Sequence, residues 1–114
     1  MLPQTNRIKK KKDFETIFKN SRSFKNNLFI FKIANNNLGL NRFGFVVSKK
    51  ISPKATIRNK VRRRMAESIK AEVLNAKMGI DIVLIALSGV EKKEFSEVKE
   101  GINNALAKAG LTIK

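Results

Sequence analysis

The segment "FGFVVSKKISPKATIRNKVRRRMAE", residues 43–67, changes its hydrophobic period near its middle. From Phe43 to Val47 the large apolar residues recur at every second position, which is the period of a β-strand. From Ile57 onward they recur at every fourth position, as on one face of a helix. Pro53 lies between the two patterns and ends the strand, because it has no N–H to donate to a sheet. The segment therefore predicts a strand followed by an amphipathic helix.

The predicted helix has one apolar stripe, and cationic side chains occupy much of the rest of its surface. The stripe, with a spacing of four, consists of Ile57, Val61, Met65, Ile69 and Val73. Ser52 or Thr56 is expected to cap the helix, and Pro53 suits its first position. The sequence leaves the choice between the two caps open. Gly79 is expected to close the segment.

Two further segments have the composition of strands. Residues 23–36 alternate, with Phe29, Phe31 and Ile33 on one face and Leu28, Ile30, Lys32 and Ala34 on the other. The Asn- and Gly-rich residues 35–42 are expected to form a hairpin loop. Residues 80–89, "IDIVLIALSG", have the composition of a fully apolar strand. Such a strand is expected at the centre of a sheet, with both faces buried.

Helices are also predicted near both ends of the chain. Phe14, Ile17 and Phe18 share one face of the first, and Asp13 is its cap or lies in its first turn. The last helix covers residues 94–110. Its expected buried residues are Phe95, Val98, Ile102, Leu106 and Ala109, and Gly110 is its expected C-cap.

The order helix, strand, strand, helix, strand, helix predicts the fold class. A hairpin followed by a strand reached through a helix gives a mixed sheet with helices packed on it. We therefore expect one α+β domain over residues 1–114, an α/β sandwich with a sheet of about four strands. Residues 1–8 are expected to be a flexible basic lead.

The composition limits the chemistry that is open to the chain. It has 25 Lys and Arg against 9 Asp and Glu, a net charge of +16. Such a charge favours a polyanionic partner, with nucleic acid ahead of an anionic membrane surface. The absence of Cys and His excludes thiolate and imidazole chemistry and the metal sites built on them. The acids are scattered, so no catalytic residue and no metal ligand is predicted.

No segment has the pattern of a membrane span or an export signal. The longest purely apolar run is residues 82–87, whereas a spanning helix needs about 20 apolar residues. Residues 1–19 contain charge but no apolar core of a signal peptide. A cytoplasmic protein without membrane contact is expected.

The central helix concentrates cations near its start, at Arg58, Lys60, Arg62, Arg63 and Arg64. These charges repel the helix dipole and one another, and no acid occurs between Glu15 and Glu67 to pair with them. A solvated helix face normally mixes both signs of charge. A phosphate-binding surface is favoured instead, because a guanidinium can hold a phosphate through two donors. Asn59 is left open between contacting a nucleotide and stabilising the helix start.

Three phenylalanines, Phe14, Phe18 and Phe31, admit two interpretations. Each can be an ordinary core residue. Lysines also flank the first helix at residues 9–12 and at Lys19. Aromatic rings interleaved with cations suit single-stranded nucleic acid, whose bases stack on rings. The sequence leaves open which rings are exposed.

The Ser-Lys-Lys of residues 48–50, followed by Arg58-Asn59 and further cations, resembles the most distinctive segment of the bacterial ribonuclease P protein family. The resemblance extends to the Lys-rich lead and to Phe14 and Phe18, and covers about residues 8–110. It implies a compact sandwich with a left-handed crossover between parallel strands, as in the second domain of a ribosomal protein. That handedness is the opposite of the usual rule.

The resemblance also implies a function. It indicates a protein subunit of ribonuclease P, one per RNA, that binds the catalytic RNA and the 5′ leader of precursor tRNA. The subunit would assist the endonucleolytic removal of the leader, while the RNA carries the chemistry. No cofactor is expected on the protein alone, and Mg²⁺ is expected in the holoenzyme.

The residues expected to bind the catalytic RNA are Lys49, Lys50, Lys54, Arg58, Asn59, Lys60, Arg62, Arg63 and Arg64. Those expected to bind the leader are Lys11, Lys12, Phe14, Phe18, Phe31 and Lys32. Lys60 stands where the family motif has a third basic residue, Arg, so a bidentate contact becomes a point-charge contact.

Two other functions fit the same composition. A structural RNA-binding protein of the ribosome or nucleoid would share the charge and the fold class. An independent nuclease would cleave RNA without an RNA subunit. Cleavage assays with and without a ribonuclease P RNA separate the three possibilities.

Repulsion among the unpaired cations predicts that anions stabilise the fold. Sulfate added in low salt should raise the melting temperature, because an anion bound only by the native state shifts the folding equilibrium. Thermal denaturation followed by circular dichroism measures this shift. The same melting curve with and without sulfate would contradict the prediction.

Overall fold

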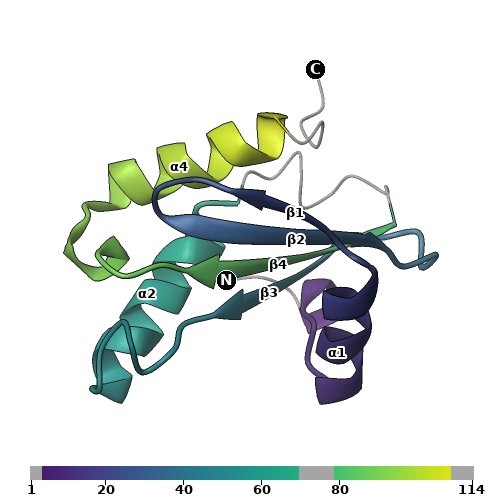
Figure 1. Cartoon of the computed structure of the whole chain (residues 1–114), viewed down its shortest axis with the longest axis horizontal. Helices are drawn as coiled ribbons and strands as arrows, with labels where there is room; N and C mark the ends of the chain where they lie inside the picture. The colour runs from purple at the N-terminus through teal and green to yellow at the C-terminus, as the bar shows by residue number, and fades with distance from the viewer. Residues whose placement is uncertain (1–3, 70–78, 109–114) are drawn as a thin grey trace.

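The computed structural model describes residues 4–69 and 79–108 (Figure 1). The elements are η1 (Gln4–Asn6, a 3₁₀ helix), α1 (Lys11–Asn20), β1 (Arg22–Lys25), β2 (Phe29–Asn35), β3 (Arg42–Val46), α2 (Ala55–Glu67), β4 (Ile80–Ala86), η2 (Val90–Lys92, a 3₁₀ helix) and α4 (Phe95–Lys108). The expected α+β class is confirmed.

The four strands form one mixed sheet in the order β1-β2-β4-β3 (Figure 1). β2 runs antiparallel to both β1 and β4, whereas β3 and β4 are parallel. The parallel pair is connected through α2, as the change of period within residues 43–67 predicts. β4 lies between two neighbours and is buried along nearly its whole length, which confirms its predicted central position.

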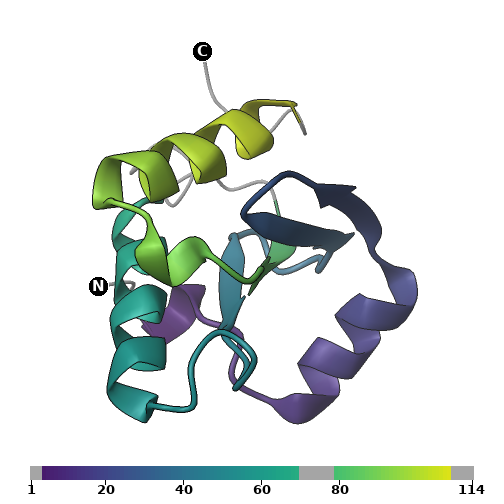
Figure 2. The same ribbon diagram turned by 60° about the vertical axis from the view of Figure 1, so that its left-hand side comes forward.

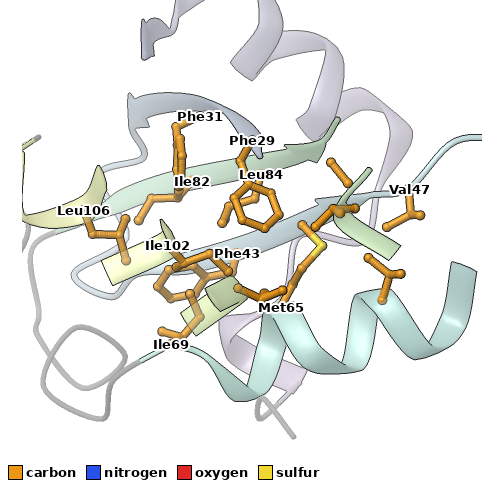
Figure 3. Close-up of a cluster of buried hydrophobic side chains, with 14 of the residues drawn as sticks. Phe29, Phe31, Phe43, Val47, Met65, Ile69, Ile82, Leu84, Ile102 and Leu106 are labelled. Carbon is orange, nitrogen blue, oxygen red and sulfur yellow. The ribbon is translucent and has the colours of Figure 1, made fainter. Parts of the chain in front are cut away.

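Helices cover both faces of the sheet (Figure 2). α2 and α4 lie together on one face, and α1 lies on the other. The larger core fills the space between the sheet and the helices α2 and α4 (Figure 3). It includes Phe29, Phe31, Phe43, Val47, Met65, Ile69, Ile82, Leu84, Ile102 and Leu106. The predicted stripe of α2 is thus confirmed at Val61, Met65 and Ile69, while Val73 lies outside the described residues.

A smaller core lies beneath α1. Ile8, Ile17 and Val83 are buried there, with Phe14 packed against them. Gly44 makes this packing close, since a Cβ at that position would lie 2.7 Å from Cε1 of Phe14. The Phe14 ring therefore rests directly on the backbone of β3.

The segment predicted as one strand, residues 23–36, is two strands. Asn26 reverses the chain, because its Oδ1 accepts hydrogen bonds from the N–H groups of Leu28 (2.9 Å) and Phe29 (2.8 Å). Such an Asx-type turn needs no Gly or Pro. The alternation on either side of the turn concealed it in the sequence. Asn26 Nδ2 also donates to the carbonyl oxygen of Gly101 (3.0 Å), which ties the turn to α4.

Neither Ser52 nor Thr56 caps α2. Lys54 occupies the N-cap position, without a side-chain cap. Ser52 is buried before the helix, and its Oγ accepts the Lys54 N–H (3.1 Å). Its carbonyl oxygen accepts a hydrogen bond from Arg58 (2.9 Å), so Ser52 organises the loop ahead of the helix.

Residues 6–8, part of the lead expected to be flexible, make hydrogen bonds along the edge of β3. Asn6 Nδ2 donates to the carbonyl oxygen of Asn41 (2.7 Å), and the Ile8 N–H donates to that of Phe43 (2.9 Å). The outer edge of β3 offers unpaired carbonyl groups, and an extended segment satisfies them.

The packed face of the last helix begins one turn later than predicted. Val98, Ile102 and Leu106 are buried as expected, but Phe95 is 39% exposed because it opens α4 ahead of the packed turns. Ala109 and Gly110 lie outside the described residues.

Asp81 is a buried charge within the strand that the sequence analysis described as fully apolar. It lies opposite Arg42 in the parallel register of β3 and β4. Arg42 Nε and Nη2 donate to its two carboxylate oxygens at 2.8 and 2.6 Å. Arg42 Nη1 also reaches Oδ2 of Asp13, in the first turn of α1, at 3.3 Å. The hydrogen bond with Asp81 raises the pKa of Arg42, and the triad joins β4, β3 and α1.

We expect the two carboxylates of this triad to differ in their contribution to stability. Asp81→Asn should lower the free energy of unfolding by about 3 kcal/mol, because it leaves Arg42 without its buried partner. Asp13→Asn should cost about 1 kcal/mol or less, since that carboxylate is partly exposed and makes one longer contact. Urea denaturation of both variants measures the difference, and equal losses would contradict it.

Candidate nucleic-acid interface

The cations of α2 and of the loop before it form one surface, called here the α2 surface. It consists of Lys49, Lys50, Lys54, Arg58, Asn59, Lys60, Arg62, Arg63 and Arg64. Arg58, Arg62 and Arg64 are half-buried and the other six side chains are exposed. Within residues 4–69 and 79–108, none of these cations forms an ion pair with a carboxylate. The charge of the α2 surface is therefore not compensated by any carboxylate in the described part of the chain.

Three arginines of the α2 surface are held by backbone carbonyl groups. Arg58 donates to Ser52 (2.9 Å), Arg64 donates to Lys93 (3.1 Å), and Arg62 donates to Val47 (3.3 Å). These neutral acceptors fix the guanidinium groups without cancelling their charge. Because each guanidinium has five N–H donors, donors remain for a phosphate. Less side-chain entropy is lost on binding when a donor is already held in place.

Asn59, left open between two roles, contacts Arg62 in the structure. Its Oδ1 accepts a hydrogen bond from Arg62 Nη1 (2.6 Å). Together with the Val47 carbonyl, it holds Arg62 toward the end of β3. Asn59 thus positions an arginine, and it is exposed on the outside of α2.

The residues expected to bind a leader lie mostly around α1. This α1 surface comprises Lys11, Lys12, Phe14, Phe18 and Lys32. The rings of Phe14 and Phe18 lie 6.5 Å apart, and Phe18 is 45% exposed, so it can offer a ring face to a base. Lys32, on β2, is half-buried and its Nζ donates to Ser23 Oγ.

Phe31 does not belong to the α1 surface. It is 1% exposed and packs edge-to-face with Phe29 in the core beneath α2 and α4 (Figure 3). Consecutive side chains of a strand point to opposite faces. Phe31 and Lys32 therefore cannot both face α1, and their assignment to one site is corrected for Phe31.

The α1 and α2 surfaces meet at the outer edge of β3. Figure 1 shows β3 at the margin of the sheet, between α2 and α1. A pocket of about 250 Å³ opens there, called here the β3-edge pocket. It is lined by Arg7, Ile8, Phe14, Phe43, Gly44, Phe45, Arg62, Arg63 and Ala66. Sequence analysis did not find Arg7, Phe45 or Ala66 as site residues, because no local pattern brings the three segments together.

The fold and these surfaces define a class of protein, namely a small basic α+β domain with an uncompensated cationic helix. No helix in the described part of the chain combines the length and apolar character needed to cross a bilayer. Comparison with known proteins gives the family. The family model for Ribonuclease P matches residues 2–110.

Relatives and solved structures agree with this family model. The ribonuclease P protein component of Clostridium acetobutylicum is 36% identical over 95% of this chain and 92% of its own length. That of Alkaliphilus metalliredigens is 34% identical over 96% of this chain and 98% of its own length. The RNase P protein of Staphylococcus aureus superposes with a TM-score of 0.83 at 29% identity, covering 95% of this chain and 98% of that protein.

Two further structures are similar. The RNase P protein of Thermotoga maritima has a TM-score of 0.79 at 31% identity, covering 90% of this chain and 96% of that protein. A Staphylococcus aureus RNase P protein mutant with defective mRNA degradation activity has a TM-score of 0.83 at 29% identity, covering 95% of this chain and 91% of that protein. The chain belongs to the ribonuclease P protein family.

The burial of the phenylalanines predicts different costs for their removal. Phe31→Ala should lower the free energy of unfolding by about 3–5 kcal/mol, because it empties a packed core site. Phe18→Ala should cost about 1 kcal/mol or less, since its ring is half exposed. Urea denaturation measures both, and Phe31→Leu serves as a milder variant if Phe31→Ala does not fold. A larger loss for Phe18→Ala would contradict the assignment.

Proposed function

We propose that this chain is the protein subunit of a ribonuclease P and acts in the 5′ maturation of tRNA. The α2 surface would dock on the catalytic RNA, one protein per RNA, and the α1 surface would hold the 5′ leader of precursor tRNA. The observation that carries this proposal is the row of unpaired cations on α2 in a chain of this family. Its relatives are named ribonuclease P protein component.

Docking on the RNA would be electrostatic. Each Lys or Arg that neutralises a phosphate releases a counterion, so affinity falls with salt. The arginines held by carbonyl groups present their donors in fixed directions, whereas the exposed lysines act as movable point charges. Lys60 is one of these exposed lysines, so its contact would add charge without fixing orientation.

The leader would be held by stacking and by charge. Phe18 offers a half-exposed ring, and Lys11 and Lys12 extend from the same helix into solvent. Stacking on an aromatic ring tolerates any base, so this surface suits leaders of different sequence. Binding the leader adds contacts away from the scissile bond and helps to position the substrate.

The protein would assist chemistry that the RNA performs. Among residues 4–69 and 79–108, no three acidic side chains gather into a possible metal site. Asp13 and Asp81 are both engaged with Arg42, so they do not suit a resident Mg²⁺. In this proposal the RNA holds the Mg²⁺ ions, which activate water when bound. The cations of this chain reduce phosphate repulsion within the complex.

A second candidate function arises from one comparison. The description of the Staphylococcus aureus mutant ties that protein to mRNA degradation. The second candidate function is therefore cleavage of RNA by this protein without an RNA subunit. A purely structural role in the ribosome or nucleoid predicts no effect on precursor-tRNA cleavage.

The experiment is reconstitution at low Mg²⁺. Adding this protein to a bacterial ribonuclease P RNA should restore precursor-tRNA cleavage. Phe18→Ala should weaken binding of leader-bearing precursor to the complex by about five-fold or more, the loss expected for one stacked base. Filter binding and single-turnover cleavage measure both quantities.

The controls separate the alternatives. Affinity for mature tRNA, which has no leader, should be the same for Phe18→Ala and for the unchanged protein. Protein alone with Mg²⁺ should not cleave; cleavage in that arm would favour the independent nuclease. Absence of any stimulation of the RNA would overturn the proposed function in favour of a structural role.

A further inference from the structure

We propose that the β3-edge pocket receives one unpaired nucleotide of the catalytic RNA. Its base would enter the pocket and its phosphate would lie on the arginines at the rim. The proposal rests on the proposed function, since it concerns the RNA that α2 would dock on. It assigns a base-binding role to a pocket whose α2 arginines, Arg62 and Arg63, were expected to make phosphate contacts.

The pocket lies at an open sheet edge, where Gly44 lets the Phe14 ring approach β3 and Ala66 leaves space on the α2 side. β3 pairs with β4 on one side only, and the segment at Arg7 covers its other side through a single bridge to Phe43. Gly44 has no side chain, so the Phe14 ring lies against the strand. Ala66 contributes only a methyl group from the α2 side. A larger side chain at residue 66 would occupy this space.

The lining combines apolar walls with positive charge. Ile8, Phe14 and Phe45 provide apolar surface, and Arg7, Arg62 and Arg63 provide guanidinium groups, with no acidic residue among the lining residues. An inorganic phosphate would satisfy the arginines but not the apolar walls. A nucleotide satisfies both, because its base is flat and largely apolar on its faces while its phosphate is anionic.

The size of the pocket favours a single ring system. Its volume of about 250 Å³ lies just below the range of about 300–1,000 Å³ typical of drug-sized ligand sites. Unpaired bases splayed out of an RNA are commonly stacked on aromatic rings or guanidinium planes. Arg62 is already held by Asn59 Oδ1 and by the carbonyl oxygen of Val47. Its guanidinium therefore needs little reordering when a base enters.

The location favours the catalytic RNA over the leader. Three lining residues, Arg62, Arg63 and Ala66, belong to α2. Of the α1 surface only Phe14 lines the pocket, whereas Phe18 and the α1 lysines do not. A backbone that follows the cations of α2 would pass this opening. The leader is the alternative source of the nucleotide, and the experiment separates the two.

The test fills the pocket without changing any charge. Ala66→Leu retains a good helix former and places a bulky side chain in the opening. It should weaken binding of a bacterial ribonuclease P RNA by between about five- and a hundred-fold, the range expected for loss of one stacked base. The slope of log affinity against log salt should be unchanged, because the number of neutralised phosphates is the same.

Matched variants control for the substitution itself. Ala107→Leu makes the same change at an exposed position of α4 and should leave RNA affinity unchanged. Arg63→Ala should instead lower the salt slope by about 0.7–0.9, the value for one phosphate. Melting curves of all variants confirm that each is folded.

Chemical probing of the RNA gives the direct readout. One unpaired nucleotide should be protected by the unchanged protein and become reactive with Ala66→Leu, while protection elsewhere is retained. Unchanged affinity and probing with a folded Ala66→Leu would overturn the inference. Loss of precursor binding alone, with catalytic-RNA affinity intact, would overturn the assignment in favour of the leader. If the unchanged protein does not bind the RNA at all, the proposed function itself fails.

Discussion

The burial of β4 on both faces governs the arrangement of the other elements. A strand without a solvent-facing side needs a packed layer on each face of the sheet. α2 and α4 provide one layer and α1 provides the other. The cationic helix α2 and the helix α1, which carries Phe14 and Phe18, therefore lie on opposite faces of the sheet. They approach each other at β3, the edge strand. The two surfaces become neighbours because the core requires two layers.

The cations of this chain differ in their partners. Some pair with carboxylates inside the protein, whereas those of α2 pair with none among the described residues. Arg42 is satisfied inside the protein by Asp81 and Asp13, and it links the sheet to α1. The cations of α2 instead find only neutral carbonyl oxygens or solvent among the described residues. This arrangement costs stability through repulsion. It leaves a positively charged surface, for which we propose the catalytic RNA of a ribonuclease P as the partner.

Sequence analysis succeeded where one hydrophobic period continued without interruption. It failed at a turn made by a single side chain and at the facing of one strand residue. The stripe of α2 and the central position of β4 were assigned correctly, because burial imposes a pattern that local sequence displays. The turn at Asn26 was missed, because its hydrogen bonds do not interrupt the alternation of apolar residues. Phe31 was assigned to the same site as Lys32. This assignment was wrong, because adjacent residues of a strand face opposite sides of the sheet.

The sequence by itself determined the change from strand to helix within residues 43–67, the core stripe of α2, the central position of β4, the cationic character of α2 and the resemblance to a family. These follow from local periodicity and composition. The tertiary structure alone decided that Arg42 meets Asp81, because this pairing depends on the parallel register of β3 and β4. It also decided that Phe14 rests on Gly44 and shares a pocket with Arg63 and Ala66. These residues are distant in the chain, and only the packing of two layers against one sheet edge brings them together.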